Sequence, residues 1–216
     1  AAGGNVTAAG VNFSSANYGT AWSITSGSND IAFDNDGGIF ALFGLSTTSV
    51  LGFAVEVRLV ATGDITRCYT VLNGLVANNG PGDYQATTLH EIGHNLGLAH
   101  TSVGMINSTS PSAGIAAQTY SNRPTMYWAS GGSNGRGWIL RPDDETSLAS
   151  KYPDASFAGA TATIRGRVFR GTNNAPVNGA TVRAVSTAST NFQVSGLSGE
   201  DGQQNGGYSI RGLAPG

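Results

Sequence analysis

Three histidines, the only ones in the chain, fall within one short window at positions 90, 94 and 100. Residues four apart share one face of a helix, so His90 and His94 are expected to present two imidazoles to one metal ion. Glu91 is offset from that face, so it is expected to reach a metal-bound water as a general base. Gly97 permits a sharp turn, after which His100 returns as a third ligand. Three nitrogen ligands with one position left for water are typical of a catalytic zinc site.

The alternative is that these histidines are unrelated surface or core residues. Three histidines placed at random would produce this spacing about once in ten thousand times, and the accompanying Glu91 and Gly97 make chance less probable still. The composition therefore favours a metal site over scattered histidines.

Two helices are predicted around this chemistry. The first covers residues 83–98, with Asp83 as its N-cap, apolar residues at helical spacing, and Gly97 as a left-handed stop. The second runs from about Pro142 to Lys151. Its first turn is acidic and its last turn is basic, as the helix dipole favours.

The remaining patterns predict strands and a change of domain. Residues 53–60 and 68–72 are predicted strands of the first domain. Beyond a stretch of small residues at 155–161, alternating segments predict further strands, with a polar stretch separating the last two. These segments are 163–169, 180–185 and 208–210. The boundary is placed near Phe157, which gives domains of residues 1–156 and 157–216.

The segment Thr87-Thr88-Leu89-His90-Glu91-Ile92-Gly93-His94-Asn95-Leu96-Gly97-Leu98-Ala99-His100 resembles the zinc-binding consensus of the metzincin peptidases, most closely that of the matrixins. Pro124-Thr125-Met126-Tyr127 resembles the methionine turn of that family. Position 128 is Trp, so the additional tyrosine ligand of astacin-like and serralysin-like members is absent. Asp143-Asp144 resembles the start of the matrixin C-terminal helix, although acidic residues are also ordinary in a first helical turn.

The resemblance implies an α+β metzincin catalytic domain with a twisted mixed sheet, a zinc helix and a C-terminal helix. It implies a zinc-dependent endopeptidase in which Glu91 activates a zinc-bound water, with Met126 beneath the metal. Tyr127 and Trp128 would help to wall a substrate pocket. The substrate, a protein or peptide, would lie extended along an edge strand, for which residues 55–59 and 71–72 are the candidates.

The last part of the chain resembles the carboxypeptidase regulatory-like, or prealbumin-like, β-domain. The resemblance rests on Ile164–Val168, Pro176–Val182 and Tyr208–Gly216. It implies a small all-β sandwich-like domain that acts as a spacer or binds a surface or another chain. This copy ends where the family continues into further strands, so the chain is expected to be a piece of a longer protein.

Composition excludes several classes of partner. The net charge is -2 and no basic run offers a nucleic-acid footprint. No stretch of about 18 apolar residues predicts a membrane span. The chain does not open with a signal-peptide pattern, so any such peptide is expected to have been removed. The low charge and the abundance of small polar residues favour a secreted, extracellular bacterial protein.

Other metal ligands are scarce. The three histidines are assigned to one catalytic zinc ion, and Cys68, the only cysteine, is expected to be a buried structural thiol. Oxygen ligands suit calcium, so any further structural ion is expected to be calcium. Asp34 and Asp36 are candidates for it, with a solvated turn as the favoured alternative.

Two rival functions stay open. The first is a catalytically inactive metzincin-fold surface or adhesion protein with a zinc-stabilised site; Glu91 argues against it, because a structural zinc needs no neighbouring base. The second is a gluzincin peptidase with a downstream glutamate as third ligand; His100 after Gly97 argues against that.

Overall fold

The computed structural model describes residues 12–13, 16, 30–79, 81–101, 124–128, 139–189, 192–200 and 204–214. The chain folds as two compact units. The first comprises Ala1–Ala99 with Ser130–Trp138, and the second comprises His100–Ala129 with Ile139–Gly216. Both α-helices and small β-sheets are present.

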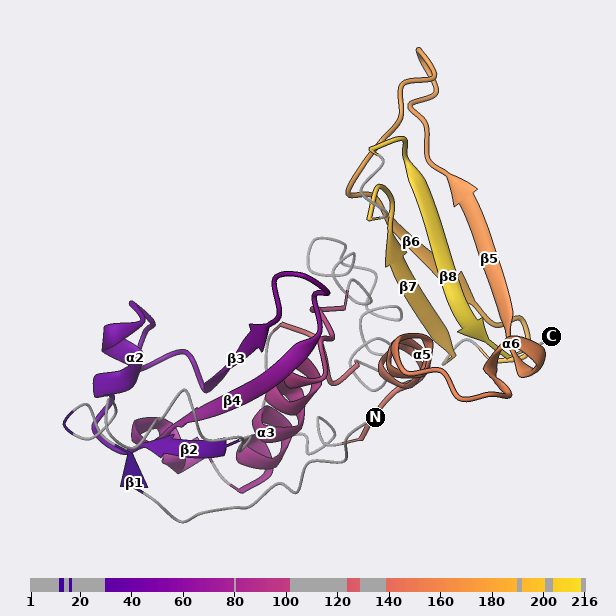
Figure 1. The fold of residues 1–216 in the computed structure, drawn as a ribbon. Helices are drawn as coiled ribbons and strands as arrows, with labels where there is room; N and C mark the ends of the chain where they lie inside the picture. The colour runs from indigo at the N-terminus through magenta and orange to yellow at the C-terminus, as the bar shows by residue number, and fades with distance from the viewer. Residues whose placement is uncertain are drawn as a thin grey trace. The chain divides into compact units, whose positions relative to one another are not determined.

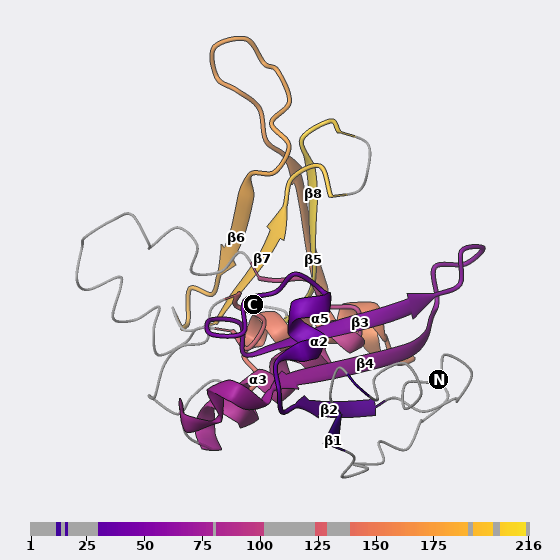
Figure 2. The same ribbon diagram turned by 90° about the vertical axis from the view of Figure 1, so that its left-hand side faces the viewer.

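The first unit contains a four-stranded mixed sheet in the order β1-β2-β4-β3 (Figures 1 and 2). Its strands are β1 (Asn12–Phe13), β2 (Asp30–Asp34), β3 (Gly52–Arg58) and β4 (Ile65–Asn73). Strand β2 runs parallel to β1 and β4, whereas β3 is antiparallel to β4. Strand β4 has a partner on each side, and its residues 67–73 are all buried. The predicted strand 53–60 is confirmed as β3, which ends two residues earlier, and the predicted strand 68–72 is confirmed as the longer strand β4.

A small apolar core fills the region where helix α2 (Gly38–Leu42) meets β2 and β4. The ring of Phe40 meets that of Phe53 edge-on, with the centroids 5.1 Å apart. The turn before α2 carries the two candidate calcium ligands. Asp36 accepts a hydrogen bond from the Gly38 amide, and Asp34 accepts one from the Phe40 amide at 2.9 Å.

The expected solvated turn is wrong for one of these two residues. Asp34 is fully buried, because its carboxylate accepts the Phe40 amide in place of water. Burial raises the pKa of this carboxyl, and the neighbouring Asp36 raises it further. A calcium ion at this turn stays a prediction.

Helix α3 (Pro81–Asn95) packs on β3 and β4 (Figure 1). It follows the 3-10 helix η1 (Gly74–Asn79) and starts two residues before the predicted N-cap, since proline is favoured in a first helical turn. Strand β4 holds the end of this helix. Cys68 Sγ donates to the Asn95 carbonyl at 3.1 Å, and Asn95 Nδ2 donates to Thr70 Oγ1 at 2.7 Å. Cys68 is a buried thiol, as predicted.

In its described part, the second unit combines two short helices with two antiparallel pairs of strands. Helix α5 spans Pro142–Lys151, as predicted, and α6 spans Phe157–Ala160. Strands β5 (Ala162–Arg167) and β8 (Gly207–Leu213) form one pair. Strands β6 (Thr181–Val185) and β7 (Gln193–Leu197) form the other. Val194, Ile210 and Leu213 form the buried core.

Strand β7 lies in the polar stretch that separates the last two predicted strands. The sequence of this strand, QVSGL, does not alternate clearly between polar and apolar residues, and only Val194 is fully buried. Its pairing with β6 across the whole of Gln193–Leu197 defines it instead. The strand is therefore defined by hydrogen bonds to a distant segment, which the local sequence does not predict.

Helix α5 packs against β7 and β8 within the second unit. The sequence-based boundary near Phe157 assigned this helix to the first domain, because the linker-like stretch of small residues at 155–161 follows it. The compact units divide the chain by packing and so part at other residues. The domains of residues 1–156 and 157–216 stay a prediction. Among the described residues, no helix is both long and apolar enough to span a membrane.

Candidate metal centre

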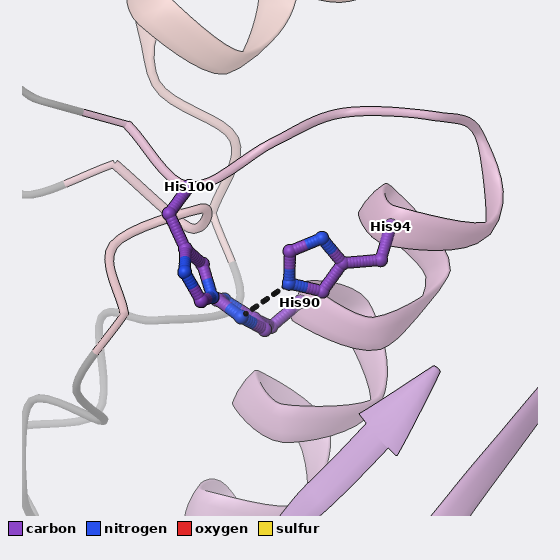
Figure 3. Close-up of side chains that lie close together, drawn as sticks. All are labelled: His90, His94 and His100. Atoms are coloured by element: carbon purple, nitrogen blue, oxygen red, sulfur yellow. Dashed lines mark hydrogen bonds between the residues drawn. The ribbon is translucent and has the colours of Figure 1, made fainter. Parts of the chain in front are cut away.

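The three histidines come together at the end of α3. One ring nitrogen from each of His90, His94 and His100 lies within 4.8 Å of the others (Figure 3). His90 and His94 project from successive turns of the helix, and their Nε2 atoms are 3.1 Å apart. Two nitrogens bound to one tetrahedral zinc ion lie about 3.3 Å apart, since each Zn–N bond is about 2.0–2.1 Å. The three side chains lie close enough to bind a metal ion.

The helix ends in a motif that returns the chain toward these side chains. Gly97 has a φ of +78°, a left-handed conformation that favours glycine, so the predicted stop is confirmed. The Gly97 amide donates to the His94 carbonyl and the Leu98 amide donates to the Gly93 carbonyl, which is the Schellman pattern. His100 follows two residues after Leu98. The motif therefore turns the chain so that His100 can face the helix that carries the first two histidines.

The same turn orients the second histidine. The Leu98 carbonyl lies 2.8 Å from His94 Nδ1, and a carbonyl oxygen only accepts, so Nδ1 carries the proton. The lone pair of the ring is then on Nε2, the atom that faces His90. A backbone acceptor on the far nitrogen is the usual way in which proteins fix the tautomer of a metal ligand. The donor set therefore fits a metal ion.

Glu91 lies in a confined place between α3 and strand β3. Only 5% of the residue is exposed, and burial raises the pKa of its carboxyl to about 7, because the charged form loses hydration. Strand β3 begins opposite it with Gly52. A Cβ atom on Gly52 would lie 2.7 Å from Thr87 Cγ2 and 3.3 Å from Glu91 Oε1. The missing side chain at position 52 thus makes room for the carboxylate.

The predicted methionine turn is a hydrogen-bonded turn in the second unit. The Tyr127 amide donates to the Pro124 carbonyl at 3.2 Å, and Met126 is buried. The Thr101 amide donates to the Met126 carbonyl at 2.8 Å, which ties the turn to the residue that follows His100. Of the two predicted pocket residues, Tyr127 is buried and Trp128 is 60% exposed.

Asp144 joins this turn to helix α5. Its carboxylate accepts the amides of Thr125 at 2.8 Å, Met126 at 3.0 Å and Arg141 at 2.9 Å. The bond from Arg141 is part of a capping box, so acidity in the first helical turn explains only one of the three. Burial raises the pKa of the Asp144 carboxyl, and the three amides oppose that rise.

Asp143 makes a second connection, which the sequence did not reveal. It accepts hydrogen bonds from Thr101 Oγ1 and from the amide and the hydroxyl of Ser195 on β7. Thr101 directly follows the predicted metal ligand His100, so its place in the sequence could have suggested a residue that positions this ligand. Ser195 lies in the polar stretch between the last two predicted strands, and no local pattern marks it.

The two candidate strands for substrate binding differ in position. Strand β4 is hydrogen-bonded to β2 and to β3, so residues 71–72 lie inside the sheet. In the described part of the chain, β3 pairs on one side alone and is the edge strand. Residues 55–58 of the first candidate are therefore at an open edge.

Comparison of the chain with protein-family models, with curated proteins and with solved structures found no match in any of the three.

Proposed function

We propose that this protein is a secreted zinc-dependent endopeptidase of the metzincin type, resembling the matrixins. The observation that carries the proposal is the convergence of His90, His94 and His100, with the carboxyl group of Glu91 buried on the same helix. A site that only stabilised the fold would have no use for a buried acid beside its ligands, because burial of an uncompensated carboxylate costs free energy.

Zinc is the ion that this donor set favours. Imidazole nitrogens suit zinc better than calcium or magnesium, which prefer oxygen ligands. Three protein nitrogens leave one position for water or substrate, as in catalytic rather than structural sites. A zinc ion held by these residues would supply Lewis acidity, which lowers the pKa of water and stabilises negative charge on a carbonyl oxygen.

Glu91 would perform the proton transfers. Without a metal ion, burial raises the pKa of the Glu91 carboxyl to about 7, which brings it into the range where a group can both accept and release a proton near neutral pH, as general acid–base catalysis requires. Glu91 would first take a proton from the attacking water. It would then donate that proton to the amine that leaves when the peptide bond breaks. With zinc bound, the positive charge of the ion would lower the pKa of this carboxyl and so favour the carboxylate form that accepts the proton.

Strand β3 is the proposed site for the substrate backbone. An edge strand presents unpaired N–H and C=O groups that can bind an extended peptide as an added strand. Gly52 at the start of β3 is also the residue packed against Glu91. A peptide added along β3 would therefore pass the start of the strand beside the proposed base. The proposed substrate is accordingly a protein or peptide in extended conformation.

A peptide cleavage assay tests the proposal. The full chain loaded with zinc should cleave an unstructured protein such as casein, and a chelator should abolish the cleavage. Glu91→Gln should keep its zinc while losing about 100- to 10,000-fold in rate, as expected for removal of a general base. Tight zinc binding without cleavage of any peptide in a diverse library would contradict the enzyme proposal and favour an inactive surface protein.

A further inference from the structure

Asp143 is a buried carboxylate whose hydrogen bonds connect two distant parts of the second unit. It is 4% exposed, and it lies in the first turn of α5. Thr101 Oγ1 donates to one of its oxygens. The Ser195 amide donates to the other at 2.6 Å, and the Ser195 hydroxyl donates to that same oxygen at 3.2 Å. Ser195 is 52 residues away along the chain, on β7.

Thr101 is thereby held on two sides. Its amide donates to the Met126 carbonyl, and its side chain donates to Asp143. The residue is 6% exposed, so water does not offer an easy substitute for these partners. Because Thr101 is joined to His100 by one peptide bond, fixing Thr101 restricts where the third imidazole can lie.

We propose that Asp143 is a positioning residue through which β7 holds the loop that carries His100. The β-strands that follow α5 are then a working part of the metal centre and not a detachable spacer. The inference rests on the proposed function only for the identity of the metal. Thr101, Asp143 and Ser195 all belong to the second unit, so the connection is internal to one compact part of the molecule.

The chemistry of Asp143 explains why the connection should be strong. Burial raises the pKa of this carboxyl, while the bonds from Thr101 and Ser195 oppose the rise. A buried carboxylate is stable only when hydrogen-bonded, so Asp143 needs the donors from both sides. If either donor is lost, one carboxylate oxygen is left without a hydrogen bond, and the loop or the strand must move to supply another. The position of Thr101 thus depends on β7, although the two are far apart in sequence.

The test uses the full chain and two measurements that do not require catalysis. The first is hydrogen exchange of the Thr101 amide, followed by nuclear magnetic resonance in metal-free protein. The second is zinc affinity, measured by competition with a chelator. Asp143→Asn and Thr101→Val should each speed exchange about tenfold and weaken zinc binding about tenfold, the lower end of the range for residues behind a metal ligand. Thr101→Ser keeps the hydroxyl and should behave as wild type.

Ser198→Ala is the matched control. Ser198 is a buried serine just beyond β7 whose hydroxyl bonds to Ala180 and Val177, so its loss perturbs the same strands without touching Asp143. It should leave Thr101 exchange and zinc affinity unchanged. Equal effects in Ser198→Ala and Asp143→Asn would overturn the proposal, because they would indicate general loosening. An unchanged Thr101 amide in Asp143→Asn would overturn it as well.

The outcome is separable from the fate of the proposed function. Zinc binding without peptidase activity in the wild type would refute the enzyme, while the affinities of the variants would still decide the role of Asp143. If the wild type bound no zinc, the proposed function would fail and the exchange of Thr101 alone would support or overturn the positioning role.

Discussion

Helix α3 buries the carboxyl group of Glu91 and helix α5 buries that of Asp144, and the surroundings of these two groups differ. Glu91 on α3 is 5% exposed, and burial alone accounts for the rise of its pKa to about 7. Asp144 on α5 is 2% exposed, yet three backbone amides oppose the rise of its pKa. The two acids are similar in chemistry and in burial, so the difference lies in the donors that surround them.

The difference indicates two kinds of role. A carboxylate that accepts three backbone amides connects pieces of structure, and these hydrogen bonds are part of the fold. A buried carboxylate without such hydrogen bonds lowers the stability of the fold, and groups whose pKa is strongly perturbed in this way cluster at functional sites. The contrast supports the proposed catalytic role of Glu91, whereas the bonds of Asp144 hold the Met126 turn against α5. Activity and stability should respond in opposite ways to their substitution.

The largest effect is expected from Glu91→Gln on activity. The substitution removes the proton acceptor but keeps the shape of the side chain, so the rate should fall by about 100- to 10,000-fold. Stability should hold or rise, because a neutral amide replaces a carboxylate that is costly to bury. Initial rates and urea unfolding of the same sample check both statements. A loss of stability together with activity would remove the contrast with Asp144.

Asp144→Ala should act on stability instead. It leaves the amides of Thr125, Met126 and half-buried Arg141 without their acceptor, at a cost of about 1–3 kcal/mol for each buried unsatisfied group. A total of roughly 3 kcal/mol is expected after partial relaxation. Denaturant unfolding measures it. Exposed Glu145 is the next residue of the same helix, so Glu145→Ala is the control and should change stability by less than about 0.5 kcal/mol.

Metal removal should have a somewhat smaller effect. A ligand that binds only the folded state stabilises it by about 2.7 kcal/mol when its free concentration is 100 times the dissociation constant. A chelator should lower the unfolding free energy by that amount in the wild type and leave His94→Ala unaffected. Elemental analysis of dialysed protein should find one zinc ion per chain. Among the described residues only the three histidines form a possible cluster, so two retained zinc ions would contradict this account.

The smallest effect is expected at the contact between β3 and Glu91. In Gly52→Ala the new methyl group would lie 2.7 Å from Thr87 Cγ2, so a side chain must shift, at a cost of about 1–3 kcal/mol in stability at most. The cleavage rate should fall even if the loss of stability is small, because the methyl group would also lie beside Glu91 Oε1 and displace the proposed base.

Two further variants of the glycine experiment separate crowding from a general effect of alanine. Thr87→Ser removes the crowded methyl group, so adding it to Gly52→Ala should restore part of the activity. Gly171→Ala places a methyl group in open space and should change nothing. If Gly52→Ala were as active as the wild type, the start of β3 would not constrain the proposed base.

Local spacing was enough to predict the parts of the site that one helix and its end can build. The four-residue interval between His90 and His94 places two imidazoles on one face of a helix whatever the rest of the fold does. Gly97 adopts the left-handed conformation that its lack of a Cβ atom allows. Helix α5 occupies its predicted range, because proline and acidic residues at its start are local signals.

Tertiary structure alone decided what supports these residues. The order of strands in the sheet placed β3 at the edge. Hydrogen bonds join Asp144 to the Met126 turn, and join Asp143 to Thr101 and Ser195, although these segments are far apart in the chain. No periodicity or capping pattern encodes such pairings, since a hydrogen bond between distant segments depends on how whole elements pack. The sequence therefore determined which side chains meet at the end of α3, and packing determined how they are held there.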